Sequence, residues 1–504
     1  MTSPGRFCRA RIQLIICAGL LFYTGPSFFA QDIYWTTEAK GAYALVTGLR
    51  VDEGLSIIRL QSITFPENRI WPYLEDYAEF LNLFVQEDLR GISGYMERSN
   101  RRLELLYALP ETNPTSLMVQ AQIHLHHCAL RLQQSQFLSA AADINKAFRL
   151  LKKNQKLYPA DAANLRLYAS LKVAFGAIPD QYRWLISLVT SLSGSIEEGL
   201  KELHSILHTT SPADNVYYAE TVLFTAVAEG RLNNDPEAGI ELMNRHFGKN
   251  PGPELAQYVL AGLLVENGNN DGAIRIISQS TVVPGAIRIP FLDYMLGECK
   301  LFRGDPDADV YFKKFLDQHK GKHYIKEAHQ KLAWYSLLKG DRPGYYHHMQ
   351  QILIHGAATT DEDQQAMHEA ESHDTPHPVL LRARLYFDGG YHEQALRLMT
   401  DAFYESLTQH GHRLEFLYRK GRILQAMKAY PEALHYYSLT IASGQFELYY
   451  YACSAALQSG VIYEITGSTS SAARFYYMCL EMVPQTYASS LHQKARMGLN
   501  RIGE

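Results

Sequence analysis

The chain has 504 residues, of which 47% are hydrophobic, 20% charged and 12% aromatic, and this apolar fraction excludes disorder as the main state. Forty-eight basic residues against 52 acidic ones give a formal net charge of −4, so no global basic field points to nucleic acid as a partner. Six cysteines in a chain of this length exclude a small disulfide scaffold.

Residues 1–30 have the pattern of a secretory signal peptide. Three arginines lie between residues 6 and 11, and a mostly apolar run follows over Ile12–Tyr23. This run is shorter than the ~20 residues that a membrane-spanning helix needs. We therefore expect cleavage after Ala30 and export to the periplasm or to the periplasmic side of an outer membrane. A retained anchor and lipidation at Cys17 are the alternatives.

Beyond the signal, apolar residues recur at three- and four-residue intervals, as in Leu203, Ile206 and Leu207. Short interruptions rich in Gly, Asn and Pro separate these runs, which predicts an all-α protein of antiparallel helices joined by short loops. The stretch Thr359–Pro378 is polar and rich in Asp, Glu and His. We expect it to be irregular and to separate the C-terminal third from the rest.

Three segments of the C-terminal third align on one template. Each has a small residue on its first helix, a second small residue twelve positions later, and large side chains one turn after these. Antiparallel helices approach closely only where side chains are small, and the large residue then fills the groove beside the contact. The template positions are Ala383, Tyr386, Ala395, Met399 and Ala402, then Gly421, Leu424, Ala433 and Tyr437, then Gly460, Tyr463, Ala472, Tyr476 and Pro484.

This pattern resembles the tetratricopeptide repeat over Val379–Pro484. The resemblance implies an α-solenoid of antiparallel helix pairs, a TPR-like superhelix with a concave face for a protein or peptide partner. The units follow one another at 38 and 39 residues, against the usual 34. The implied organisation is a signal peptide at 1–30, a degenerate TPR-like helical region at 31–358 and better-matched TPR units at 379–504.

Weaker copies of the small-residue pair occur upstream, in Ala42 with Gly54, Ala226 with Ala238, and Ala261 with Ala273. A second resemblance concerns residues 174–200, where a Pro-interrupted apolar segment is followed by the turn Ser193-Gly194-Ser195 and by Gly199-Leu200. This stretch is similar to the tetratricopeptide repeat protein 39 family, which implies helical-repeat architecture without a catalytic site. An ordinary buried helix pair is the alternative.

The sequence lacks the common catalytic and metal-binding signatures. It contains no P-loop, no dinucleotide fingerprint, no nucleophile elbow and no Cys-x-x-Cys motif. His368 and His373 are five residues apart, which turns them about 140° from each other on a helix, so we expect a polar loop rather than a zinc site. His124 and His126 share a predicted helix with His127 but point to opposite sides. We therefore predict no enzyme activity, no cofactor and no metal.

The chain has 33 tyrosines, and many of them crowd the C-terminal units. Neighbouring residues on a helix are 100° apart, so consecutive tyrosines cannot all face inward. Rigid amphipathic rings on a concave face suit contact with a protein or peptide. The candidate partner-binding residues are Tyr386, Tyr391, Tyr430, Tyr436, Tyr449 and Tyr450. Aromatic filling between lengthened helices explains the excess equally well.

The sequence thus predicts an exported, non-enzymatic helical-repeat protein that acts as a protein–protein interaction scaffold in the cell envelope. An enzyme or small-ligand-binding protein in an atypical helical fold is the alternative, and a subunit obligately associated in an envelope assembly is a third. Peripheral association with the envelope and the oligomeric state stay open. Cys453 and Cys479 lie in neighbouring predicted helices, where they either pair or remain buried thiols.

Overall fold

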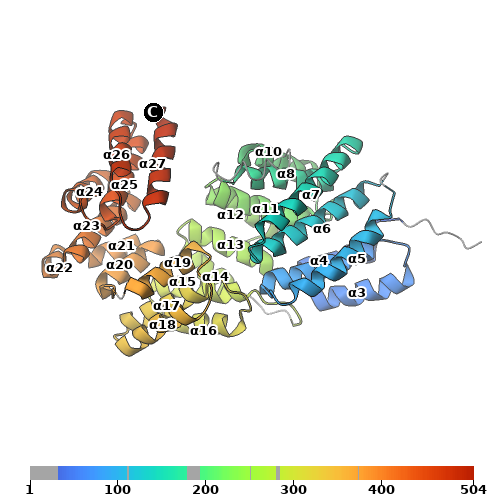
Figure 1. Ribbon diagram of the computed structural model, residues 1–504, viewed down its shortest axis with the longest axis horizontal. Helices are drawn as coiled ribbons and strands as arrows, with labels where there is room; N and C mark the ends of the chain where they lie inside the picture. The colour runs from blue at the N-terminus through green and yellow to red at the C-terminus, as the bar shows by residue number, and fades with distance from the viewer. Residues whose placement is uncertain (1–31, 111–112, 179–192, 250, 280–283, 373) are drawn as a thin grey trace, which may run out of the picture. The chain divides into compact units, whose positions relative to one another are not determined.

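The computed structural model describes residues 32–110, 113–178, 193–249, 251–279, 284–372 and 374–504, and these are all-helical apart from connecting segments and one isolated bridge between Asp32 and Asn68 (Figure 1). The proposed signal peptide and the apolar segment 179–192 lie outside the described residues. Within the described part of the chain, no helix has the length and hydropathy of a membrane span.

Two compact units divide the chain. Unit 1 comprises the residues up to Val85, Leu89–Thr221 and Pro284–Ile287. Its helices are α2 (Thr37–Thr47), α3 (Val51–Thr64), α4 (Ile70–Gln86), α5 (Ile92–Tyr107), α6 (Pro114–Gln133), α7 (Phe137–Leu157), α8 (Ala162–Gly176) and α10 (Ile196–Thr209), with the start of α11 (Tyr218–Val227). Neighbours in sequence pack on each other, α2 on α3, α6 on α7 and α8 on α10.

Unit 2 comprises Gln86–Asp88, Val222–Val283 and Arg288–Glu504. After the end of α11 it contains the π-helix η1 (Ala228–Leu232) and then α12 (Pro236–Phe247), α13 (Glu254–Glu266), α14 (Asn270–Ser278), α15 (Pro290–Arg303), α16 (Ala308–Gln318), α17 (Ile325–Leu338), α18 (Arg342–Ile354), α19 (Asp361–Ser372), α20 (Pro378–Asp388), α21 (His392–Leu398), α22 (Asp401–Ser406), α23 (His410–Ala426), α24 (Tyr430–Gly444), α25 (Tyr451–Ile465), α26 (Thr469–Glu481) and α27 (Ala488–Ile502).

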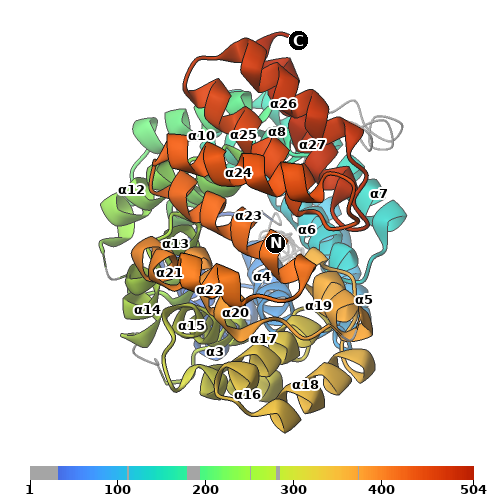
Figure 2. The same cartoon turned by 90° about the vertical axis from the view of Figure 1, so that its left-hand side faces the viewer.

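Helices of unit 2 pack in sequential pairs. Helix α13 lies on α14, α15 on α16, α17 on α18, α20 on α21, α23 on α24 and α25 on α26. The first helix of a pair also contacts the first helix of the next, as α20 does with α23, α23 with α25, and α25 with α27. Figure 2 shows α23 to α27 side by side.

The template positions lie where these helices cross, as expected. Gly421 and Gly460 have no room for a side chain, because a Cβ atom at either position would lie 2.6 and 2.5 Å from the rings of Tyr437 and Tyr476, respectively. Both rings are fully buried. The small residue on one helix and the large residue on its partner therefore form one interlocking contact. Ala402, in contrast, is exposed on α22.

The small-residue pairs predicted upstream match the helix crossings of the structure to different degrees. Ala261 and Ala273 are both fully buried on α13 and α14. On α12 the residue at the crossing is Gly239, whose Cβ would lie 2.6 Å from the carbonyl oxygen of Ala226, and not the expected Ala238. The π-helix η1 lies between the two positions. Its wider turn takes up one extra residue, which shifts the register of the pair from twelve to thirteen.

The polar stretch Thr359–Pro378 is not irregular as expected, because Asp361–Ser372 forms helix α19. Ala366 and Ala370 face inward, and the buried carboxylate of Asp363 accepts backbone hydrogen bonds from Tyr324 and Glu327 at 2.7 and 3.1 Å. The helix depends on small residues and on bonds to a distant segment, neither of which gives an apolar periodicity. The polar loop expected at His368 is therefore wrong.

Candidate functional site

Unit 2 contains a cleft made of two overlapping cavities of about 450 and 540 Å³. Its walls come from α19, α20 and α23 and from the segments that precede α25 and α27. A smaller cavity of about 170 Å³ continues from it between α20 and α23. The residues that line both larger cavities are Glu369, Ser372, Asp374, Arg384, Tyr449, Tyr450, Tyr451 and Tyr487. We call the cleft formed by the two larger cavities, with all of its lining residues, the tyrosine cleft.

Four tyrosines form one wall of the tyrosine cleft. The ring of Tyr450 lies 4.5 Å from that of Tyr451 and meets that of Tyr487 edge-on at 5.0 Å, and Tyr449 stacks on Tyr451 at 6.0 Å. A backbone hydrogen bond of 2.9 Å from Gln485 to the carbonyl of Leu448 joins the two segments that carry them. Burial raises the pKa of both Tyr450 and Tyr451, so their hydroxyls stay protonated and can donate hydrogen bonds.

Two arginines give the tyrosine cleft fixed positive charge. Arg419 pairs with Glu415 at 2.6 Å, and Arg384 lies 3.5 Å from Asp388 with its guanidinium 4.8 Å from the ring centre of Trp334. Burial alone lowers the pKa of Arg419, but the attraction of Glu415 outweighs it and raises the pKa overall. Both guanidinium groups therefore remain charged at any pH at which the protein is folded.

A half-buried carboxylate lines the same cleft. Glu369 on α19 accepts hydrogen bonds from the indole of Trp334 at 2.9 Å and from the side-chain amide of Gln330 at 2.6 Å. Burial raises the pKa of Glu369 above its ordinary value. Aromatic rings, phenolic donors, guanidinium groups and a carboxylate thus surround one hollow, which can hold a polypeptide segment by ring packing and by bonds to its polar groups.

The structure brings only two of the six predicted tyrosines into this cleft, Tyr449 and Tyr450. Tyr391 instead donates a hydrogen bond to Asp271 at 2.9 Å and accepts one from Asn270 at 3.0 Å, which ties it to α14. Tyr386, Tyr430 and Tyr436 are half-buried and pack against neighbouring helices.

The sequence interpretation missed Tyr451, Tyr487, Arg384 and Arg419 as members of the cleft. Tyr451 was visible in the run of three tyrosines at 449–451. Arg384 directly follows Ala383 and Arg419 precedes Gly421 by two residues, which places the two arginines about 60° apart around the template helix. That shared face was a signal the sequence contained. Tyr487 enters only through the pairing of two distant segments, which no local pattern contains.

Away from the tyrosine cleft, unit 2 contains another cavity of about 410 Å³ that combines aromatic rings with carboxylates. Phe291 stacks on Tyr294 at 4.9 Å and meets Tyr324 at 4.6 Å. Burial raises the pKa of Glu298 to about 7, although Lys331 lies 3.4 Å away and lowers it. The carboxylates that line this cavity are Glu266, Glu298, Glu327 and Glu362, with Arg231 as the one basic residue of its lining. We call it the acidic aromatic pocket.

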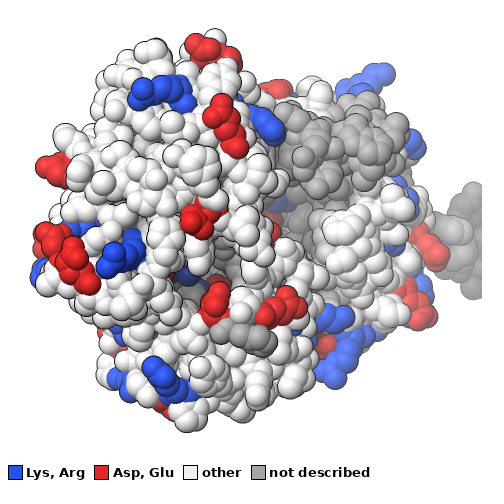
Figure 3. All heavy atoms as spheres, turned by 60° about the vertical axis from the view of Figure 1, so that its left-hand side comes forward, with Lys and Arg blue, Asp and Glu red and all other residues white. Residues whose placement is uncertain are grey.

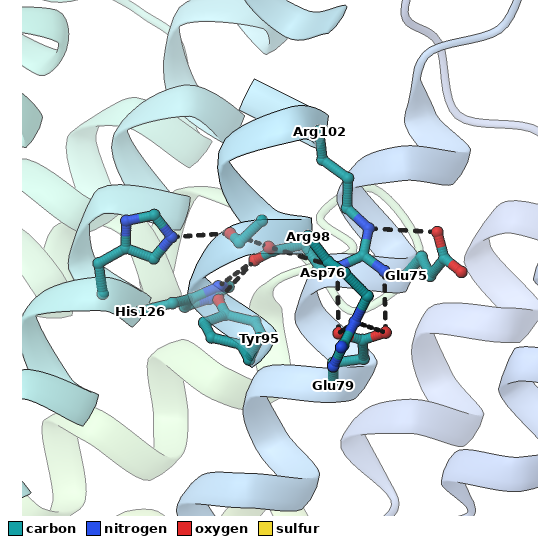
Figure 4. A network of polar contacts seen from close by, with 9 residues as sticks. Glu75, Asp76, Glu79, Tyr95, Arg98, Arg102 and His126 are labelled. Atoms are coloured by element: carbon teal, nitrogen blue, oxygen red, sulfur yellow. Dashed lines mark hydrogen bonds and ion pairs between the residues drawn. The ribbon is translucent and has the colours of Figure 1, made fainter. Parts of the chain in front are cut away.

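Unit 1 has a buried polar network centred on Asp76 of α4 (Figure 4). The Asp76 carboxylate is fully buried and accepts hydrogen bonds from the hydroxyl of Tyr95 at 3.0 Å, from Ser99 and from Nδ1 of His126 at 3.1 Å. Arg102 lies 3.9 Å from the same carboxylate. A buried charge with this many donors is satisfied, and its role is to fix α4, α5 and α6 against one another.

On the face drawn in Figure 3, basic and acidic side chains are interspersed among neutral ones, as the near-balanced composition suggests.

Comparisons with known proteins add no identity to these sites. No protein-family model matches the chain, and no curated protein matches it.

Proposed function

We propose that this chain is an exported, non-enzymatic helical-repeat protein that binds a segment of a partner protein in the tyrosine cleft. In this proposal the helix pairs of unit 2 form a TPR-like α-solenoid, and the first helices of successive pairs supply its inner face. The single observation that carries the proposal is that α20, α23 and the start of α25 place Arg384, Arg419 and Tyr450 around one hollow.

The chemistry of the cleft favours a polypeptide over a compact metabolite. Its two overlapping cavities are open and extend across α19, α20, α23 and the segments before α25 and α27. Tyrosine rings contribute large contact areas at a low cost in side-chain entropy, and such rings and arginines are enriched among residues that dominate binding energies. A partner segment with an acidic group beside an apolar side chain would complement the arginines and the rings together.

A pair of photo-crosslinkers tests this proposal. Tyr449 lines the cleft and Tyr477 lies on α26 outside its lining, yet both side chains are 47% exposed. A benzophenone amino acid replaces each in turn in the full chain, expressed in its native host. We expect a discrete crosslinked partner from position 449 that is absent from position 477. Equal labelling from both positions, or none from 449, would contradict the proposal.

A second candidate function, binding of a small cationic ligand, is favoured by the acidic aromatic pocket. Aromatic faces and carboxylates around one cavity attract an organic ammonium group. Titration with benzyltrimethylammonium, followed by calorimetry, tests it. Binding that Glu298→Gln weakens would support this function, whereas heats no larger than those of dilution would exclude this class of ligand.

A further inference from the structure

Helices α6 and α7 of unit 1 bring two imidazoles and a carboxylate together in the protein interior. His124 and His127 are three residues apart and therefore share one face of α6, and Asp143 faces them from α7. One potential ligand atom from each of the three lies within 4.8 Å of the others. Exposure is only 3% for His124, 2% for His127 and 1% for Asp143.

From this geometry we infer that His124, His127 and Asp143 form a binding site for a divalent transition-metal ion, with zinc as its natural occupant. Two imidazoles and one carboxylate are a ligand set that suits zinc, and a water molecule would complete four-coordination. The proposal is independent of the tyrosine cleft, which lies in the other unit.

The spacing of the ligand atoms supports this inference. Nδ1 of His124 lies 3.4 Å from Oδ1 of Asp143 and makes no hydrogen bond. Two ligand atoms bound to one tetrahedral zinc ion at about 2.0 to 2.1 Å are about 3.3 Å apart. The pair is therefore already at the separation that a shared ion would impose, and a ligand atom of His127 lies within 4.8 Å of both.

The outer partners of the imidazoles point the same way. Nε2 of His124 is 2.7 Å from the hydroxyl of Tyr107, and Nε2 of His127 is 2.7 Å from the hydroxyl of Ser99. The Ser99 hydroxyl in turn bonds to the buried Asp76 carboxylate. A metal-bound histidine characteristically has its other ring nitrogen held by a hydrogen bond of this kind. The bond at Nε2 fixes the ring and leaves Nδ1 as the nitrogen that would bind the metal.

A basic side chain beside the Asp143 carboxylate works against metal binding. Arg131 lies 2.6 Å from Oδ2 of Asp143, on the carboxylate oxygen away from His124. Its side chain is 27% exposed. The guanidinium orients the carboxylate but also opposes a dication, so its removal should strengthen metal binding.

Metal uptake by the full chain tests the site. Protein stripped with EDTA and dialysed is loaded with zinc sulfate or cobalt chloride, and bound metal is measured by elemental mass spectrometry. We expect one zinc ion per chain, and cobalt absorption bands of tetrahedral intensity. Zinc at 100 times its dissociation constant should raise the thermal midpoint of unit 1 by roughly 5 to 10 °C.

Variants separate this site from adventitious binding. His127→Ala and Asp143→Asn should each weaken zinc binding by roughly 100-fold or more, while Arg131→Gln strengthens it. His208→Ala, on the exposed face of α10, is the matched control and should bind as wild type. If circular dichroism shows that Asp143→Asn is unfolded, His127→Gln replaces it. No zinc uptake by the wild type, or equal uptake by wild type and His127→Ala, would overturn the inference.

Discussion

Replacement of Gly460 by alanine measures how much the repeat contact depends on a missing side chain. The new Cβ would lie 2.5 Å from Cε1 of Tyr476, whereas carbon atoms in contact normally stay about 3.5 to 4.0 Å apart. The ring has no room to move away, since a Cβ at Gly498 would also lie 2.5 Å from it. Overpacking costs about 1 to 3 kcal/mol, and the better helix propensity of alanine returns about 0.5 to 1 kcal/mol.

We therefore expect Gly460→Ala to destabilise α25 and α26 by about 0.5 to 2 kcal/mol. Hydrogen exchange of the amides in these two helices, followed by mass spectrometry, gives the local opening free energy. Gly41→Ala is the control, because Gly41 lies in helix α2 with nothing within 4 Å of its Cβ position, and it should stabilise α2. Tyr476→Leu should cost less in the Gly460→Ala background than in the wild type. If Gly460→Ala stabilises α25 as Gly41→Ala stabilises α2, the interlocking contact is refuted.

Three further outcomes follow from buried polar groups and thiols. Asp76→Asn should destabilise unit 1 by about 3 to 5 kcal/mol, because the buried side chains of Tyr95, Ser99 and His126 lose the charged acceptor that they share. Urea unfolding followed by the fluorescence of buried Trp71 measures this loss, and a change below 1 kcal/mol would contradict it. Burial, together with the neighbouring histidines, lowers the pKa of His329 to about 4, whereas a histidine of the unfolded chain has a pKa near 6.5. The contribution of His329 to stability is therefore complete above pH 6.5 and is lost as the pH falls toward 4. Relative to His329→Gln, the wild type should lose on the order of 1 kcal/mol between pH 6.5 and 5 in urea titrations, and parallel curves would refute this assignment. The Sγ atoms of Cys453 and Cys479 lie 3.5 Å apart, so diamide should link α25 to α26 by a disulfide that peptide mapping detects, and unmodified thiols after oxidation would argue against their proximity.

Local periodicity predicted the helices and their closest contacts. Small residues at Gly421 and Gly460 and large ones at Tyr437 and Tyr476 identify a helix crossing, because both members of the contact repeat at a fixed spacing. The same reasoning was off by one residue at Ala238, since the π-helix before it adds a residue that no composition signal marks. It also missed α19, whose buried face is made of alanines and whose Asp363 bonds to a distant segment.

The candidate sites were less accessible to sequence reasoning than the helices. Tyr449 and Tyr450 were selected because consecutive rings cannot all be buried, and they do line the cleft. Tyr391 was also selected, although no tyrosine adjoins it in sequence, and it bonds to Asp271 of α14. The cluster of His124, His127 and Asp143 was not expected, because its carboxylate comes from the next helix and only the packing of α6 on α7 places it there.

Hydrogen exchange of the complex tests the central proposal most directly. The segment captured by the crosslinker at Tyr449 is synthesised and added to the full chain, and amide protection is compared with that of the free protein. The proposal predicts protection in α19, α20, α23 and the segment that leads into α25, with none in α16 or α18. Protection spread over α16 and α18, or no protection around Tyr449 and Tyr450, would contradict binding in the tyrosine cleft.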